Sequence, residues 1–392
     1  MKFNYEKLGS LIEISEKKNS DLAVDNLVGM NINKEFIPSV ANTIGTNLAR
    51  YKIIHKDQFA CNLMHVGRDK SVVVSKYSLE NPSIISPAYK IFQVKDTSII
   101  LPDFLMLYFL RSEFDRLGWF YTDSSIRGSL DWSKFCSIEI PVLDIDIQKK
   151  IVDIYQFFND RIELKERINN NLFNIVSSIQ TDWMVNFTPF KSNQFKSSSF
   201  GLIPENWNVG ELGDVIELLD SKRIPLSGQE RENMEKIYPY YGAASLMDYV
   251  DDYIFDGIYL LIGEDGTVID DKGFPILQYV WGKFWVNNHA HIVKGKNGFN
   301  VDSLYLLLSQ TNIQSIVTGA VQAKVNQSNL KSIEIIIPPV EVMKKFNDLI
   351  KPFFDTIRSN HDEIKKIQKL RDILLPKLMS GEIDVSEVKC DL

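Results

Sequence analysis

The feature that most constrains the fold of this chain is an internal repeat with a period of about half its length. The segment Val66-Gly67-Arg68-Asp69 resembles Ile262-Gly263-Glu264-Asp265, which begins 196 residues later. Ser137-Ile138-Glu139-Ile140 recurs as Ser332-Ile333-Glu334-Ile335 at an offset of 195 residues. Matches in one order at nearly one offset favour a duplicated unit. The alternative is a general likeness among apolar strands and helices, and the polar Gly-x-Asp match argues against it.

A long heptad pattern closes each half of the repeat. Positions spaced alternately by four and three residues are mostly apolar from Ile147 to Ile179 and again from Met343 to Leu378. This spacing predicts two helices of about 38 residues, or about 57 Å, that pair through an apolar seam. The intervening globular segment favours an antiparallel pair, and Pro352 predicts a kink or a short break. The seam is expected to contain Ile151, Ile154, Phe158, Leu172, Phe353, Ile357, Ile364 and Ile367.

The expected fold class is α+β, with two similar globular domains separated by two long antiparallel helices that form a coiled-coil spacer. Each globular half holds short β-rich runs, an apolar helix and a closing strand that ends at a proline. A serine-rich linker between the halves is expected to be flexible. The expected boundaries are a first domain at 1–144, a long helix at 145–187, the linker at 188–200, a second domain at 201–340, a second long helix at 341–380 and a tail at 381–392.

Composition excludes several classes of protein. Hydrophobic residues make up 44% and charged residues 24% of the 392 residues, which is ordinary for a globular protein. The three cysteines lie far apart, which argues against a disulfide framework or a zinc knuckle and favours a reducing, cytoplasmic compartment. No run of about 18 apolar residues occurs, so no membrane span is expected.

The net charge of −7, taken alone, argues against a nucleic-acid-binding protein. The acidity is concentrated in residues 201–340, where 10 Lys and Arg stand against 18 Asp and Glu, a net charge of −8. Residues 1–144 hold 17 of each sign and are neutral. Affinity for phosphates would therefore have to come from a few local cations or from partner subunits.

Catalytic motifs are missing from the sequence. There is no Gly-x4-Gly-Lys-Ser/Thr loop for nucleotide phosphates. Asn81-Pro82-Ser83-Ile84 only poorly matches the Asn/Asp-Pro-Pro-aromatic loop of amino-methyltransferases. His289 and His291 alternate on a predicted strand, but no third ligand follows at a useful spacing, so a structural hydrogen-bonding role is favoured over a metal site. We therefore expect neither a catalytic nor a metal site.

Several motifs resemble those of type I restriction–modification specificity subunits. Phe200-Gly201-Leu202-Ile203-Pro204-Glu205-Asn206-Trp207 is similar to the start of that family's second recognition domain, and Tyr238-Pro239-Tyr240-Tyr241-Gly242-Ala243 to its Tyr-Pro-x-Tyr-Gly segment. Leu374-Leu375-Pro376-Lys377-Leu378-Met379-Ser380-Gly381-Glu382-Ile383 closely resembles its C-terminal signature. The segments 34–39 and 48–54 resemble a common kind of N-terminal half, so the resemblance covers essentially the whole chain. Glu264 departs from it, because the family often has a basic residue there.

The resemblance implies a DNA-binding subunit that is not itself an enzyme. Each recognition domain would read one half of a bipartite target in double-stranded DNA. The two helices would set the distance between the half-sites and bind two methyltransferase (M) subunits. S-adenosylmethionine would belong to the M subunits, and ATP and Mg to motor and endonuclease (R) subunits, so this chain is expected to bind no cofactor.

Candidates for DNA contacts are basic, amide and aromatic residues in predicted loops, because Arg and Lys recognise guanine and Gln recognises adenine in the major groove. The loops 122–129 and 318–324 are expected to correspond, since each precedes a closing strand. In the first domain the candidates are Arg68, Lys70, Lys76, Tyr121, Ser125 and Arg127. In the second domain they are Lys222, Arg223, Tyr240, Tyr241, Lys272, Gln322 and Lys324. For each residue, a solvated surface position is the competing interpretation.

Other functions compatible with the sequence stay open. The chain could be the specificity subunit of an orphan or type IIB-like methylase or nuclease. It could also be a stand-alone enzyme with an unrecognised site, or a coiled-coil scaffold without DNA specificity.

Overall fold

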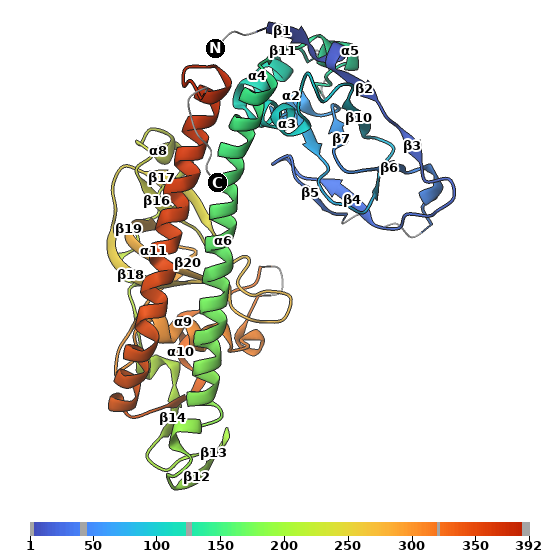
Figure 1. Ribbon diagram of the computed structural model, residues 1–392. Coiled ribbons are helices and arrows are strands. Elements are labelled where there is room, and N and C mark those ends of the chain that lie inside the picture. Colours follow the sequence, from blue (N-terminus) through green and yellow to red (C-terminus); the bar gives the residue numbers. More distant parts are fainter. Residues whose placement is uncertain (1–3, 40–44, 123–127, 320–321, 386–392) are drawn as a thin grey trace. The chain divides into compact units, whose positions relative to one another are not determined.

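Two compact units make up the chain in this computed structural model, which describes residues 4–39, 45–122, 128–319 and 322–385. Unit 1 comprises residues 1–164 and 363–392, and unit 2 comprises residues 165–362. Two helices of 40 residues, α6 (Ile145–Met184) and α11 (Val340–Met379), contribute to both units (Figure 1). Within the described ranges, no helix combines the length and apolar content that a membrane crossing requires.

Unit 1 is built on two sheets and a strand pair. The main sheet is antiparallel, in the order β2 (Ile12–Ile14), β10 (Lys90–Val94), β7 (Phe59–Asn62) and β8 (Val73–Lys76). The second sheet has the order β3 (Lys17–Lys18), β6 (Lys52–Ile54), β9 (Ser83–Ile85), β4 (Leu27–Met30) and β5 (Phe36–Pro38), with β4 and β9 parallel. Strand β1 (Asn4–Lys7) pairs with β11 (Glu139–Val142). The short helices are α1 (Leu8–Leu11), η1 (Leu48–Arg50), α2 (Val66–Asp69), α3 (Pro102–Leu110), α4 (Ser112–Phe120) and α5 (Trp132–Ser137).

Unit 2 is built on a six-stranded sheet and two strand pairs. The sheet has the order β15 (Ile216–Leu218), β20 (Ala290–Gly295), β18 (Phe255–Gly263), β19 (Leu277–Val286), β16 (Tyr238–Tyr241) and β17 (Leu246–Val250), and only β16 and β19 are parallel among these described neighbours. The pairs are β14 (Asn208–Glu211) with β21 (Glu334–Ile337), and β12 (Phe195–Ser198) with β13 (Gly201–Pro204). The short helices are η2 (Thr188–Phe190), α7 (Leu212–Val215), η3 (Asp220–Lys222), α8 (Gly228–Glu232), α9 (Val301–Ser309), η4 (Gln314–Ile316) and α10 (Gln327–Lys331).

The internal repeat predicted from the sequence is present in the fold. The strand order β2-β10-β7-β8 in unit 1 is matched by β15-β20-β18-β19 in unit 2, and β1–β11 is matched by β14–β21. The N–H of Leu8 donates to the carbonyl of Ile138 at 2.8 Å, and Leu212 donates to Ile333 at the same distance. Equivalent hydrogen bonds at equivalent positions support a duplicated unit.

The apolar runs of the sequence form the interior of each unit. In unit 1, Phe59 and Phe92 stack with ring centroids 5.1 Å apart, and Phe109 and Phe135 complete the cluster. In unit 2, the side chains of β18 are buried on both faces of the sheet, because Leu260 joins one core cluster and Leu261 the other. Each fully buried side chain of this size contributes about 1.5–3 kcal/mol. Helix α9 covers one face of β18.

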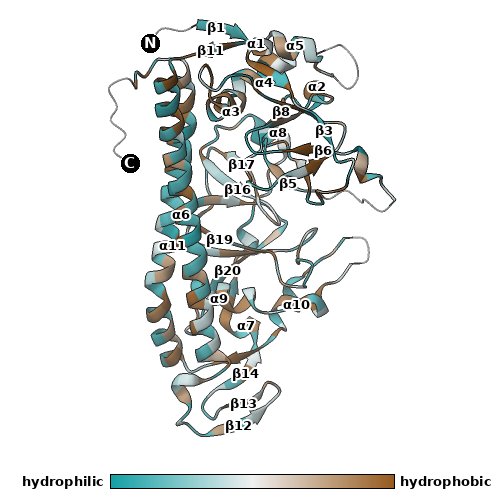
Figure 2. Cartoon of the chain, turned by 45° about the vertical axis from the view of Figure 1, so that its right-hand side comes forward, coloured by the Kyte–Doolittle hydropathy of each residue, from teal (hydrophilic) through white to brown (hydrophobic). Residues whose placement is uncertain are grey.

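The two long helices pair antiparallel, as predicted. Within unit 1, Arg161 of α6 pairs with Glu363 of α11 at 2.7 Å, while the earlier Asn159 accepts from the later Arg371 at 2.8 Å. Within unit 2, Lys165 reaches Asn360, and the later Asn169 reaches the earlier carbonyl of Ile357. Figure 2 shows polar colour over much of both helices, interrupted by apolar patches.

All the predicted seam residues are at least partly buried, but they serve three different clusters. Phe158, Ile364 and Ile367 pack between the helices with Ile162. Ile151 and Ile154 pack in the core of unit 1. Leu172, Phe353 and Ile357 pack in the core of unit 2.

The heptad pattern misplaces the seam in the second half of α6. Ile168 and Ile175, expected inside, are 38% and 46% exposed, whereas Asn169 and Val176 are buried. A helix with about 3.6 residues per turn drifts by about 20° per heptad, so the buried face moves on by one residue. Pro352 also causes no break, since α11 is assigned as one helix from end to end.

The linker is more structured than expected. Residues 188–200 contain η2 and strand β12, which pairs with β13. Phe187 and Phe190 pack edge-on against the fully buried Trp207 at 5.3 and 5.2 Å. The Gly-x-Ile-Pro-x-x-Trp motif therefore anchors the segment after α6, which a serine-rich composition alone does not predict.

The C-terminal motif closes unit 1. Leu375, Leu378 and Met379 belong to its core cluster, and helix α11 ends at Met379. Gly381 follows with a φ of +72°, the left-handed conformation of a helix stop, and its N–H donates to the carbonyl of Leu378. Gly381 therefore ends the helix in the conformation that glycine favours.

Candidate nucleic-acid interface

In unit 1, the loop before the closing strand rests on the Gly-x-Asp segment of helix α2. The N–H of Gly67 donates to the carbonyl of Gly128 at 2.7 Å. A Cβ on Gly67 would lie 2.7 Å from the Cα of Gly128, so this approach requires glycine. The N–H of Leu130 adds a bond to the carbonyl of Leu63. The candidates Ser125 and Arg127 lie outside the described residues.

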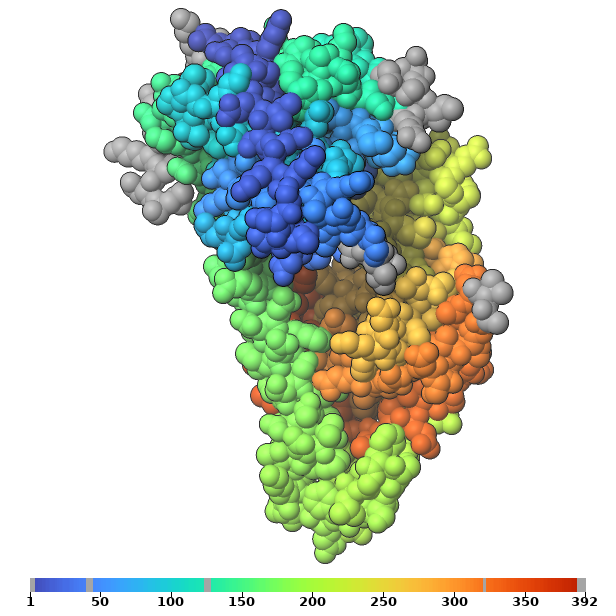
Figure 3. Space-filling view, turned by 90° about the vertical axis from the view of Figure 1, so that its right-hand side faces the viewer, coloured from blue at the N-terminus to red at the C-terminus, as the bar shows by residue number. Residues whose placement is uncertain are grey.

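A similar loop contact occurs in unit 2, although it uses Gly266 and not Gly263, the residue that corresponds to Gly67 in the repeat. The N–H of Gly266 donates to the carbonyl of Ala323 at 3.0 Å, and the N–H of Val325 donates to the carbonyl of Glu264 at 2.8 Å. Thr318 and Lys324 exchange both backbone hydrogen bonds, which closes the loop 318–325 into a hairpin. Figure 3 shows the orange atoms of the 310–330 segment at the surface beside the yellow-orange atoms around residue 265. In both units, a described residue near the C-terminal end of the loop, Gly128 or Ala323, accepts a backbone hydrogen bond from a glycine segment.

Three of the first-domain candidates surround α2 and the end of α4. Arg68 is exposed and forms a bidentate ion pair with Asp69, in which Nε donates to Oδ1 at 2.7 Å and Nη2 donates to Oδ2 at 3.1 Å. Lys70 is exposed and lies 5.1 Å from the ring centroid of Trp119. Tyr121 is exposed next to Phe120, which is 80% exposed. These basic and aromatic groups suit phosphate contact and base stacking.

Lys76 is apart from this group. Its ammonium contacts the carboxylates of Asp57 and Asp103, each at 2.9 Å, and its side chain is 12% exposed. Burial favours a lower pKa for Lys76, but the hydrogen bonds to Asp103 and Asp57 outweigh it and raise the pKa. Two carboxylates neutralise this ammonium, so we leave Lys76 out of the interface.

In the second domain, Gln322, Lys324 and Lys222 are exposed at neighbouring loops. Lys324 lies 3.6 Å from Glu264, and its side chain is half exposed. Lys272 is also exposed, in a separate turn that the carboxylate of Asp270 closes. The structure thus brings together three of the seven candidates in this domain.

Arg223 adjoins these loops but its guanidinium is largely buried. It pairs with Glu264 at 2.7 Å, approaches Asp220 at 3.6 Å and donates to the carbonyl of Ala290 at 2.8 Å. Glu264, the residue that departs from the family pattern, is therefore the counterion of Arg223 and Lys324. We assign Arg223 to the support of the loops.

The two tyrosine candidates belong to the interior. Tyr240 is 1% exposed; its hydroxyl accepts from the N–H of Leu226 at 3.1 Å, and Arg231 stacks 5.0 Å from its ring. Tyr241 packs edge-on against Phe284, and burial raises the pKa of its hydroxyl. The Tyr-Pro-x-Tyr-Gly segment is thus mainly a packing motif of strand β16.

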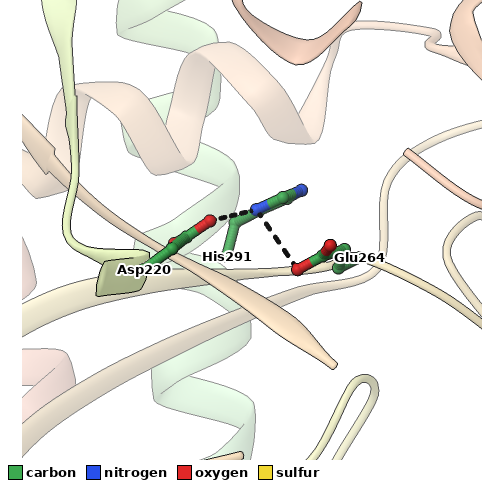
Figure 4. Close-up of side chains that lie close together, drawn as sticks. All are labelled: Asp220, Glu264 and His291. Atoms are coloured by element: carbon green, nitrogen blue, oxygen red, sulfur yellow. Dashed lines mark hydrogen bonds and ion pairs between the residues drawn. The ribbon is translucent and has the colours of Figure 1, made fainter. Parts of the chain in front are cut away.

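A buried charge cluster lies beneath the loops of unit 2 (Figure 4). Asp220, Glu264 and His291 have ligand-type atoms within 4.8 Å of one another, the arrangement of a potential metal site. However, Nδ1 of His291 bonds to Asp220 at 2.6 Å and Nε2 bonds to the carbonyl of Val325 at 2.7 Å. Both partners are acceptors, so each ring nitrogen is placed to donate a hydrogen bond. This agrees with the hydrogen-bonding role expected for His291.

The cluster is stabilised in its charged form. Burial favours a lower pKa for His291, but its hydrogen bonds to Asp220 and Val325 outweigh burial and raise the pKa above the usual value. Burial favours a higher pKa for Asp220, yet the bonds from His291 and the N–H of Ile292 lower it. Sequence reasoning missed Asp220, because nothing along the chain marks it as the partner of a residue 71 positions away.

Comparisons with known proteins agree with this geometry. Residues 204–369 match the family described as the type I restriction modification DNA specificity domain. The MjaIX specificity subunit of Methanocaldococcus jannaschii is 28% identical over 279 residues, which cover 66% of this chain and 64% of that protein. The putative specificity subunit S.HindORF215P of Haemophilus influenzae is 36% identical over 131 residues, 33% of each chain. The matched part therefore spans less than two thirds of either relative.

A solved structure shares the fold. The S subunit of a type I restriction–modification system from M. genitalium aligns over 96% of both chains with a TM-score of 0.57 at 14% identity. The domain match and the relatives agree with the resemblance to type I restriction–modification specificity subunits, and the solved structure shows a shared fold.

Proposed function

We propose that this chain selects the DNA sequence for a type I restriction–modification complex and reads a bipartite target, one half with each repeat. The carrying observation is the loop contact that occurs twice, Gly67 with Gly128 and Gly266 with Ala323. In each repeat a glycine segment binds the backbone at the C-terminal end of this loop, and exposed cations lie beside the glycine segment, Arg68 and Lys70 in the first repeat and Lys324 in the second. A duplicated reading surface suits a target in two parts.

The helices α6 and α11 are proposed to set the distance between the half-sites. Forty residues at about 1.5 Å per residue give about 60 Å of rigid support. Half-sites on one face of a duplex are separated by multiples of about 34 Å, so a stiff spacer can select the separation. The exposed faces of these helices would bind two methyltransferase subunits.

The chemistry is assigned to partner subunits. Methyltransferase subunits would bind S-adenosylmethionine, and motor and endonuclease subunits, where present, would use ATP and Mg. With a net charge of −8 in residues 201–340, this chain is expected to bind DNA weakly by itself, because phosphate contacts supply most of non-specific affinity. The partners would complete the positive channel around the duplex.

A domain exchange tests the two-reader proposal. Residues 1–144 are replaced by those of another family member, and DNA methylation is mapped in cells that also express the methyltransferase partner. We expect one half of the methylated sequence to change while the other half stays. Since Leu375, Leu378 and Met379 complete the core of unit 1, the donor should match this chain at those positions. A change in both halves would contradict the proposal.

The same system tests the spacer and the alternatives. Insertion of one heptad into α6, with a matching heptad in α11, is expected to lengthen the gap between the two halves of the methylated sequence or to abolish methylation. An unchanged gap would show that the helices do not set this distance. Methylation or cleavage by the purified chain alone would favour a stand-alone enzyme. If expression leaves no bipartite sequence methylated, a scaffold without DNA specificity is the better description.

A further inference from the structure

His291 lies where two loop segments of unit 2 meet. It is 0% exposed, on strand β20. Nδ1 donates to Oδ2 of Asp220, and Nε2 donates to the carbonyl oxygen of Val325. A neutral imidazole has one N–H, so only the protonated ring can make both bonds.

Each partner of His291 leads directly to a candidate reading segment. Asp220 is the first residue of η3, which ends at the exposed Lys222. Val325 ends the hairpin 318–325, which carries Gln322 and Lys324. Gln327, two residues beyond Val325, donates to Oδ2 of Asp220 at 2.6 Å. The imidazolium therefore joins the hairpin to η3 from beneath.

The charges around the ring are nearly balanced. Asp220 and Glu264 face Nδ1 at 2.6 and 3.8 Å. Arg223 pairs with Glu264 at 2.7 Å, and Lys324 lies 3.6 Å from the same carboxylate. Deprotonation of His291 removes one of its two donors, so either the carbonyl of Val325 loses this donor, or Asp220 keeps only Gln327 and the N–H of Ile292 and faces a lone pair on Nδ1. An unpaired buried acceptor is costly, and the hairpin or η3 has to move to regain a bond.

We propose that His291 is a positioning residue for sequence reading by the second repeat, because its protonated ring holds the hairpin 318–325 against η3. Reading of that half-site weakens when the ring loses its proton. This inference rests on the proposed function. Its pH range follows from the pKa of His291, which lies above the usual value despite burial because Asp220 and Val325 accept from the ring.

The test uses the full chain with its methyltransferase partner and a pool of double-stranded DNA with randomised base pairs. Bound duplexes are sequenced after selection at about pH 6.5 and about pH 9, a range in which Lys and Arg side chains stay mostly charged. The variants are His291→Gln, which cannot titrate, and Asp220→Asn, which removes the charge that favours the proton. His55→Gln, an exposed imidazole of the other repeat, is the matched control.

The wild type and the control are expected to lose about tenfold in discrimination in one half of the selected motif at high pH, and to keep the other half. His291→Gln is expected to show that loss at both pH values. Asp220→Asn should move the loss to lower pH. The unchanged half of the motif reports that unit 1 is folded in each variant.

Other results overturn the inference. His291 has no role in reading DNA if the wild type discriminates equally well at both pH values in the half of the motif assigned to the second repeat. The same conclusion follows if both variants select an intact motif. Equal weakening of both halves assigns it to general stability instead. A wild-type complex that selects no motif at either pH overturns the proposed function itself, and the inference with it.

Discussion

The N–H of Gly67 donates a 2.7 Å hydrogen bond to the carbonyl of Gly128, and a side chain on either glycine would collide with the backbone of the other. This contact seats the loop before the closing strand of unit 1. A similar contact in unit 2 joins Gly266 to Ala323. In each repeat, a glycine segment thus binds the backbone at the C-terminal end of the loop.

Gly67→Ala is expected to displace that loop. The new Cβ would lie 2.7 Å from the Cα of Gly128, a backbone atom that cannot rotate away. Overpacking of this kind costs about 1–3 kcal/mol, measurable as a lower denaturation midpoint for unit 1. Gly29→Ala is the control, because a Cβ there meets nothing within 4 Å. Equal midpoints for the two variants would show that the glycine contact is dispensable.

A buried amide pair joins the long helices within unit 2. Nδ2 of Asn360 donates to Oδ1 of Asn169 at 2.8 Å, and the two residues are 9% and 6% exposed. Asn169→Ala leaves the Asn360 amide without its acceptor, so we expect a loss of about 1–3 kcal/mol in unfolding experiments. Asn169→Leu combined with Asn360→Leu is expected to recover stability while weakening register specificity. Ile175→Ala, at an exposed position, is the control. A double variant as unstable as Asn169→Ala would refute this explanation.

Cys61 should be unreactive in the folded protein. It is 1% exposed, and burial raises the pKa of its thiol to about 12. The thiolate is the reactive form, so alkylation at pH 8 is expected only after unit 1 opens. Mass spectrometry of iodoacetamide-treated protein, in a background with Cys136→Ser and Cys390→Ser, measures that rate. Labelling as fast as that of a free thiol would contradict the burial of Cys61.

The stability of unit 2 should depend on pH through His291 and Asp220. His291 has a raised pKa, so its contribution is complete below the unfolded value of about 6.5 and is lost as pH rises through the folded value. Asp220 has a lowered pKa, so its contribution is complete above the unfolded value of about 3.9 and is lost as pH falls through the folded value. Chemical denaturation followed by tryptophan fluorescence should therefore show that the free energy of unfolding declines at alkaline pH. His291→Gln should lack this decline, and a decline of equal size in that variant would locate its origin elsewhere.

Much of the fold could be predicted, because periodicity and local composition determine which elements form. The apolar helix expected in each half is α3 in unit 1 and α9 in unit 2. Strand β18 is one of the expected β-rich runs. The seam of α6 was predicted less well, since its second half packs against the core of unit 2 as well as α11.

By itself, the sequence determined the repeat, the two long helices, the family resemblance and the loops where reading is expected. These depend on spacing and residue type along the chain. Only the tertiary structure decided which of the candidate Lys and Arg side chains are buried against ion-pair partners and which are exposed and so available to contact DNA. Lys76 is held by Asp57 and Asp103, and Arg223 by Glu264. It also decided that the two ring nitrogens of His291 lie within hydrogen-bond distance of two acceptors, Asp220 and Val325. The charge state and accessibility of a side chain depend on partners that distant segments bring within a few ångströms. A local sequence pattern does not predict such long-range contacts.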